Sequence, residues 1–136
     1  MSPLPAGYEN AVTFSFGDSP ELADELLALV LAGTKTATCD AVGAYSAAEP
    51  MPVVGRRDVV LDGRGRPACA IETVEVELRR FDEVDARFAA DEGEGDRTLA
   101  YWRRVHEDYF RRHGSFAPDM MLVCERLKVI EVFSRD

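Results

Sequence analysis

The order of hydrophobic and polar positions in the first quarter of the chain predicts a strand followed by a helix. Residues 12–16, VTFSF, alternate in polarity and are rich in strand-forming residues. Ser19 and Pro20 then suit the N-cap and first position of a helix, and leucines recur at helical spacing until Gly33. We therefore expect a short strand and then an amphipathic helix that ends at Gly33.

The rest of the pattern predicts a hairpin, two helices and a closing strand. Residues 57–78 read as two strands around a turn at Asp62 and Gly63. The other expected elements are a loop over 44–52, a short helix from Asp82 to about Ala90, a loop over 92–96, a helix over 98–113 and one bent strand or two short ones over 120–133. The order strand, helix, strands, helices, strand favours a mixed α+β domain over alternating βαβ units.

Length and composition favour a small globular protein. The 136 residues, of which 46% are hydrophobic and 30% charged, are enough for one core, so we expect a single domain over residues 1–136. No apolar run approaches the roughly 20 residues needed to cross a bilayer, and the N-terminus does not resemble a secretory signal. Three separated cysteines without a CxxC pair suggest reduced thiols, which predicts a cytoplasmic location.

The net charge of −9 bears on any interaction with nucleic acid. A chain this acidic repels long polyanions unless its arginines gather on one face. Arg97, Arg104 and Arg111 recur every seven residues, with Tyr101 and Trp102 nearby as surfaces on which bases could stack. The alternative, which the pattern favours, is a solvated helix face with the aromatic rings in the core.

Lys35 is the first candidate for chemistry. It is one of only two lysines, and it lies in the hydroxyl-rich run GTKTAT at the end of the first predicted helix. A partly desolvated lysine can lose its proton and act as a base, which arginine cannot do. The structural alternative is a basic residue that interacts with the last carbonyl groups of the helix.

Two other groups of residues are weaker candidates. His106 and His113 share a helix face, but zinc needs closer spacing and further ligands, so we expect no metal and no cofactor. Cys39 could be a nucleophile with His106 as its base, although buried unreactive cysteines are commoner.

Three motifs together resemble the ASCH domain family, in particular its longer bacterial members. They are GTKTAT after the first helix, VVLDGRGRPACAIETVEVELRRFDEV over residues 59–84, and EGEGDRTLAYWRRVHEDYF over residues 92–110. The resemblance implies a small mixed β-barrel of the PUA-like type with flanking helices and a cleft beside the first helix. It also implies RNA binding. Some members are hydrolases, of which one kind cleaves single-stranded RNA without a metal and another removes the acetyl group from acetylated cytidine.

The resemblance also implies site residues. Gly33, Lys35 and Thr38 match the family pattern GxKxxTxR, whereas Asp40 stands where the pattern has arginine. By its position before the second long helix, Glu92 resembles the acidic residue that acts with the lysine and threonine in the amidohydrolases.

The chemistry of these groups leaves two mechanisms open. In amide hydrolysis, a neutral Lys35 takes the proton of the Thr38 hydroxyl while Glu92 orients the pair. In RNA cleavage the 2′-hydroxyl attacks, and a charged Lys35 stabilises the negative charge that develops on phosphorus. Residues three apart in a strand point to opposite faces, so Lys35 and Thr38 can cooperate only across a turn or bulge.

Three functions therefore remain as hypotheses. They are a metal-independent hydrolase of single-stranded RNA, which the resemblance favours, an amidohydrolase of an acylated cytidine, and a non-catalytic RNA-binding module. The partner is RNA or a nucleoside, and the oligomeric state stays open, a dimer included. The candidate residues are Lys35, Thr38 and Glu92 for catalysis and Gly33, Tyr45, Arg56 and Trp102 for substrate binding, with Arg57 as a further phosphate contact.

Overall fold

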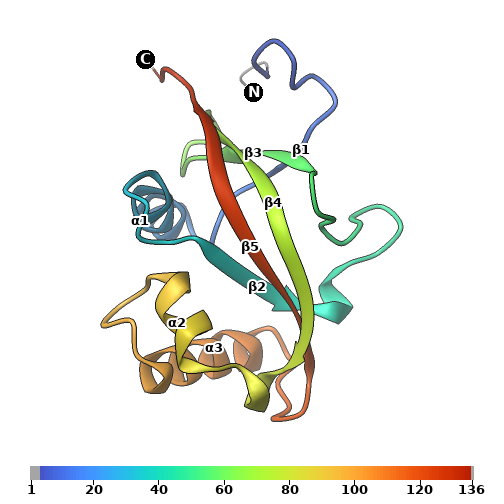
Figure 1. Ribbon diagram of the computed structural model, residues 1–136, viewed down its shortest axis with the longest axis vertical. Helices are drawn as coiled ribbons and strands as arrows, with labels where there is room; N and C mark the ends of the chain where they lie inside the picture. Colours follow the sequence, from blue (N-terminus) through green and yellow to red (C-terminus); the bar gives the residue numbers. More distant parts are fainter. Residues whose placement is uncertain (1–3, 136) are drawn as a thin grey trace.

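The structure, a computed structural model that describes residues 4–135, is built on one curled five-stranded sheet (Figure 1). The strands are β1 (Val12–Phe14), β2 (Ala37–Ala41), β3 (Arg57–Leu61), β4 (Pro67–Arg80) and β5 (Met121–Val132). Their order across the sheet is β1-β3-β4-β5-β2, with β1 parallel to β3 and the other pairs antiparallel. The sheet curls into a half-barrel, and with its helices it confirms the predicted mixed α+β fold.

Three α-helices cover the sheet in two places. The first, α1 (Pro20–Leu31), lies to one side of the sheet, whereas α2 (Ala86–Glu92) and α3 (Leu99–Arg112) lie together below β2 in Figure 1. Two short 3-10 helices, η1 (Val42–Ala44) and η2 (Phe81–Glu83), follow β2 and β4. None of the helices between residues 4 and 135 combines the length and apolar character of a membrane span.

Two hydrophobic clusters join the helices to the sheet. In the first, Leu26, Leu27 and Val30 of α1 pack against Val60 and Ile71 of β3 and β4. The second lies between α2, α3 and the β2–β5 pair and contains these buried side chains: Ala37, Phe81, Val84, Phe88, Ala89, Trp102, Phe110, Leu122 and Cys124. The sheet therefore carries separate cores at its two ends.

The two long predicted helices are confirmed with their caps. Ser19 accepts a hydrogen bond from the Leu22 amide at 3.1 Å, and Thr98 accepts one from the Tyr101 amide at the same distance. Gly33, just after α1, has a φ of +79°, which glycine adopts without steric cost.

The short predicted helix is present, but its predicted start was wrong. Asp82 lies in η2, and α2 begins instead at Ala86, with the Asp85 carboxylate accepting a hydrogen bond from the Phe88 amide at 2.9 Å. Val84, between them, has an extended backbone and is buried in the second cluster. The chain turns inward to bury Val84 before the helix can start.

The hairpin prediction is confirmed, and its turn depends on Asp62. The Asp62 carboxylate accepts the backbone N–H groups of Arg64 and Arg66, each at 2.9 Å. It also accepts the guanidinium groups of Arg66 at 2.9 Å and Arg135 at 3.1 Å. Burial would raise the pKa of Asp62, but these donors, the Arg66 amide first, lower it to about 2.

Asp62→Asn tests this account of the turn. Because the pKa of Asp62 is lower in the folded state, its charge stabilises the fold above the unfolded pKa, and this contribution disappears as pH falls through about 4 to about 2. The variant should lose roughly 1–2 kcal/mol of unfolding free energy at neutral pH and almost nothing near pH 2. Urea unfolding at both pH values, with the exposed Asp119→Asn as control, measures the difference. A deficit that did not change with pH would contradict it.

Candidate functional site

The turn after α1 directs Lys35 into the protein. The amides of Thr34 and Lys35 both donate to the Leu29 carbonyl, at 3.0 and 3.1 Å, which closes the helix. The Thr36 amide then donates to the Asp91 carbonyl at 2.7 Å and ties this segment to the end of α2. As a result the Lys35 side chain is only 1% exposed, the largest of the fully buried side chains.

The Lys35 ammonium group is surrounded by acceptors. Its Nζ atom donates to Glu92 Oε1 at 3.0 Å, to Glu94 Oε2 at 2.9 Å and to the Ala37 carbonyl at 2.9 Å. Burial would lower the pKa of Lys35, but the two carboxylates outweigh it and raise the pKa above its usual value. Lys35 is therefore charged, and its three protons are used.

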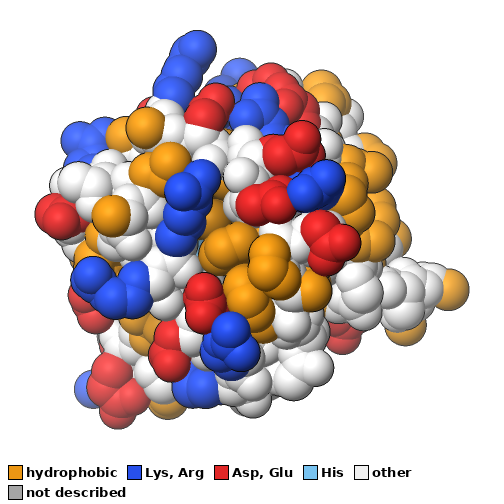
Figure 2. Space-filling model, turned by 90° about the horizontal axis from the view of Figure 1, so that it is seen from below, with side chains coloured by type: hydrophobic (Ala, Val, Ile, Leu, Met, Phe, Trp, Pro, Cys, Tyr) orange, Lys and Arg blue, Asp and Glu red, His pale blue; other side chains and the backbone are white. Residues whose placement is uncertain are grey.

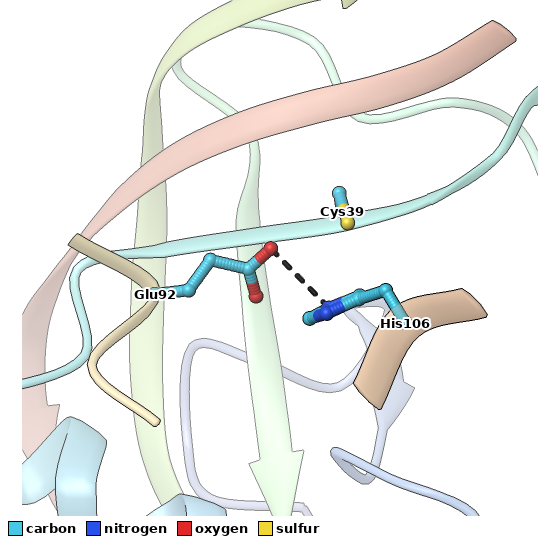
Figure 3. Close-up of side chains that lie close together, drawn as sticks. All are labelled: Cys39, Glu92 and His106. Atoms are coloured by element: carbon cyan, nitrogen blue, oxygen red, sulfur yellow. Dashed lines mark ion pairs between the residues drawn. The ribbon is translucent and has the colours of Figure 1, made fainter. Parts of the chain in front are cut away.

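Glu92 is held from a second direction by α3. Its Oε2 atom accepts a hydrogen bond from Trp102 Nε1 at 2.8 Å and lies 3.5 Å from His106 Nε2. Figure 3 shows the His106 ring and the Glu92 carboxylate facing each other. Burial would raise the pKa of Glu92, but Lys35 and then His106 lower it well below its usual range, so the carboxylate is ionised.

Cys39 completes this group of side chains. Its sulfur, a Glu92 oxygen and a His106 nitrogen all lie within 4.8 Å of one another (Figure 3). Burial, followed by the nearby Glu92 charge, raises the pKa of Cys39 well above its usual value. The structure thus brings Cys39 and His106 together, but it holds Cys39 as a neutral thiol, a poor nucleophile.

A cleft of about 650 Å³ opens beside these residues. It is lined by parts of β1, β2, β5 and α3 and by the segment before β3. The predicted site residues that line it are Lys35, Thr38, Tyr45, Arg56 and Glu92. Cys39, Asp40, Glu94, His106 and Glu125 line it as well.

Thr38 lies in β2, half-buried, and faces the cleft. It pairs with Glu125 of β5, so the two side chains stand on the same face of the sheet. Within residues 4–135 there is no hydrogen bond between Thr38 and Lys35. The structure places both residues on one cleft but joins Lys35 to Glu92 rather than to Thr38.

The other predicted binding residues differ in position. Tyr45 is half-buried on the cleft wall. Arg56 is on the cleft too, but Asp58 holds its guanidinium group in two hydrogen bonds of 2.8 and 2.9 Å. Gly33 is exposed at the end of α1, and Trp102 is buried in the second cluster, where its ring orients Glu92.

The cleft is acidic. Six of its lining residues are carboxylates, namely Asp40, Glu49, Asp58, Glu92, Glu94 and Glu125. Its three cations are Lys35, Arg56 and Arg112, and each is paired with at least one carboxylate. Figure 2 shows one outer face of the molecule, where acidic and basic side chains are interspersed rather than gathered in a basic patch.

Asp40 and Glu125 have no cationic partner within the described part of the chain. Burial raises the pKa of both carboxyl groups. Glu125 accepts a hydrogen bond from the Thr73 hydroxyl at 2.6 Å, and Asp40 accepts one from the Ala41 amide at 2.8 Å. Both carboxyl groups are available to a ligand in the cleft.

Sequence reasoning did not assign Glu94 or Glu125 to the site. Glu94 lies in the predicted acidic loop 92–96, so the cluster of carboxylates there was a signal. For Glu125 the signal was a charged residue that follows an apolar run, Met120 to Cys124, in the last predicted strand.

Comparisons with known proteins agree with this architecture. The family model for the ASCH domain matches residues 12–131. The crystal structure of an ASCH domain from Lactobacillus crispatus is similar, with 37% identity, a TM-score of 0.83, and coverage of 91% of this chain and 82% of that one. A protein from Enterococcus faecalis has 34% identity, a TM-score of 0.81, and coverage of 93% and 84%. A Zymomonas mobilis ASCH protein, at 12% identity and a TM-score of 0.57 over 91% of this chain and 73% of that one, shares the fold. No curated protein matches the chain.

Proposed function

This chain belongs to the ASCH domain family, and on that basis we propose that its acidic cleft binds an uncharged nucleoside and hydrolyses an acyl amide on it. Membership of this PUA-like family supports a function of the RNA-binding type. The observation that favours a nucleoside over an RNA chain is the charge of the cleft. Six carboxylates against three paired cations oppose a phosphate backbone but not a neutral ligand.

The state of Lys35 defines its part in the reaction. A charged lysine cannot take a proton from Thr38, but it can stabilise negative charge on a carbonyl oxygen under attack. All three protons of the Lys35 ammonium already form hydrogen bonds, so the substrate oxygen has to replace one of their acceptors. Glu94 is that acceptor, because it is more exposed than Glu92 and lies on the loop after α2.

Thr38 and Glu125 supply the attack. A threonine hydroxyl needs an adjacent base, and Glu125 stands across from Thr38 on the neighbouring strand. Because burial raises its pKa, Glu125 is better suited to accept a proton than an exposed carboxylate is. Thr38 then attacks the acyl carbon, the amine leaves with a proton, and water releases the acyl group from Thr38.

RNA cleavage is the second candidate, because that mechanism requires a protonated lysine and Lys35 is protonated. Two carboxylates at about 3 Å from the Lys35 nitrogen oppose the approach of a phosphate, however. Both functions therefore use the same charged ammonium group, but only RNA cleavage requires a phosphate to approach it past these two carboxylates.

Turnover of acetylated cytidine and of labelled single-stranded RNA, each measured in EDTA, tests the proposal. We expect deacetylation and no RNA cleavage. Thr38→Val should lower kcat/KM for deacetylation by about 100-fold or more. Thr36→Val is the matched control, since Thr36 is exposed and outside the cleft lining, and it should leave kcat/KM unchanged. RNA cleavage without deacetylation would favour the second candidate, and full activity of Thr38→Val would remove Thr38 from the mechanism.

A further inference from the structure

Cys39, Glu92 and His106 present three donor atoms to one point on the wall of the cleft. The three side chains come from β2, α2 and α3, and their donor atoms lie within 4.8 Å of one another (Figure 3). From this convergence we propose that they form a binding site for a zinc-type divalent ion, with the cleft supplying the fourth position.

The orientation of the His106 ring supports the site. His106 Nδ1 lies 2.9 Å from the Trp102 carbonyl oxygen, which can only accept, so Nδ1 carries the proton. The Trp102 ring stacks on the imidazole, with 4.3 Å between centroids and an angle of 18°. Zinc-bound histidines are commonly fixed in this way, by a hydrogen bond from the nitrogen that does not bind the metal. Nε2 is thereby turned toward Glu92.

The spacing of the donors supports it too. His106 Nε2 and Glu92 Oε2 are 3.5 Å apart, longer than a good hydrogen bond. Two ligands at 2.0–2.2 Å from a tetrahedral zinc ion are separated by about 3.3–3.6 Å. Rotation of the Cys39 side chain, which is within reach of both, completes a set of three ligands.

The chemistry of the donors selects the ion. Sulfur, imidazole nitrogen and a carboxylate oxygen suit Zn²⁺ or Co²⁺ and do not suit Mg²⁺ or Ca²⁺, which prefer oxygen. Three protein ligands and one open position are typical of zinc sites that bind a water or a ligand. All three residues line the cleft, so an ion can enter from solvent.

The charges around the site also accommodate an ion. Without it, the ammonium of Lys35 faces the carboxylates of Glu92 and Glu94, and His106 lies beside Glu92. When the ion binds, the Cys39 thiol releases its proton to solvent, as does His106 Nε2 where it carries one, so part of the added positive charge is offset. Glu92 keeps its contact with Lys35, because that contact uses its other oxygen atom.

Metal titration of the EDTA-treated and desalted full chain tests the inference. We expect one Zn²⁺ per chain by calorimetry, and with Co²⁺ an absorption band from sulfur coordination. Cys39→Ser and His106→Gln should each weaken binding by 10-fold or more. The matched controls Cys69→Ser and His113→Gln, whose residues lie in the other cluster and at the end of α3, should bind like the native chain.

Several results would overturn the inference. They are no zinc binding, cobalt binding without the sulfur band, or native affinity in Cys39→Ser or His106→Gln. If either of these variants fails to fold, the Co²⁺ spectrum still tests the site. The native chain has to show the sulfur band, and Cys69→Ser has to retain it. Turnover is not part of this test, so its outcome is independent of the proposed hydrolysis.

Discussion

Replacing Lys35 with methionine is expected to lower the free energy of unfolding by about 3–5 kcal/mol at neutral pH. Methionine fills a similar volume, but it leaves the buried Glu92 carboxylate without its ammonium partner. Removing one member of a buried ion pair costs more than the pair itself contributes, because the remaining charge stays desolvated. Urea unfolding of the native chain and the variant measures this loss.

Two further measurements separate charge from packing. Without Lys35, burial raises the pKa of Glu92 relative to the native chain, so protonation relieves the loss and the deficit should be smaller near pH 5 than near pH 8. Lys35→Met combined with Glu92→Gln should recover part of the deficit, because the amide oxygen can still accept from Trp102. A deficit that is equal at both pH values and persists in the double variant would assign the effect to lost packing.

Gly93→Ala is expected to damage both the fold and the site. A β-carbon on Gly93 would lie 2.5 Å from the Thr34 carbonyl oxygen and 3.0 Å from Lys35 Cα, and the φ of Gly93 is +76°. Overpacking and the left-handed backbone together should cost roughly 2–5 kcal/mol. The contacts are with backbone atoms, which cannot rotate away, so the loop with Glu94 has to move from Lys35 and turnover should fall as well.

Gly33→Ala is the matched control for that variant. Gly33 has nearly the same φ, +79°, but a β-carbon there would meet no atom within 4 Å. Gly33→Ala should lower the free energy of unfolding only through the left-handed backbone conformation, by about 1–2 kcal/mol, and should leave turnover unchanged. Thermal unfolding and acetylated-cytidine turnover of both variants check the comparison. Equal losses in the two glycine variants would mean that the close approach to Thr34 does not matter.

The elements that the sequence predicted well are those with local causes. Ser19 and Thr98 cap their helices through bonds to amides three residues away, and Asp62 forms its turn within four residues. The short helix was placed wrongly because Asp82 and Asp85 are both suitable caps. The burial of Val84 in a core formed by distant residues decides between them.

The candidate site also has features that a local motif predicts and features that depend on distant residues. Lys35, Thr38 and Glu92 were predicted as site residues because they match the motifs of the family resemblance, and all three line the cleft. The protonation state of Lys35 could not, since it depends on Glu92 and Glu94, which are 57 and 59 residues away. The same holds for Glu125, whose position opposite Thr38 is set by the pairing of β2 with β5.

That pairing also determines when the cleft can be completed. Strand β2 lies at the edge of the sheet, and its neighbour there is β5, the last strand of the chain. During synthesis the segment with Lys35, Thr38 and Cys39 leaves the ribosome long before the strand that holds it in place. The cleft is therefore complete only after β5 has emerged and paired with β2, because β5 contributes Val123 and Glu125 to its lining.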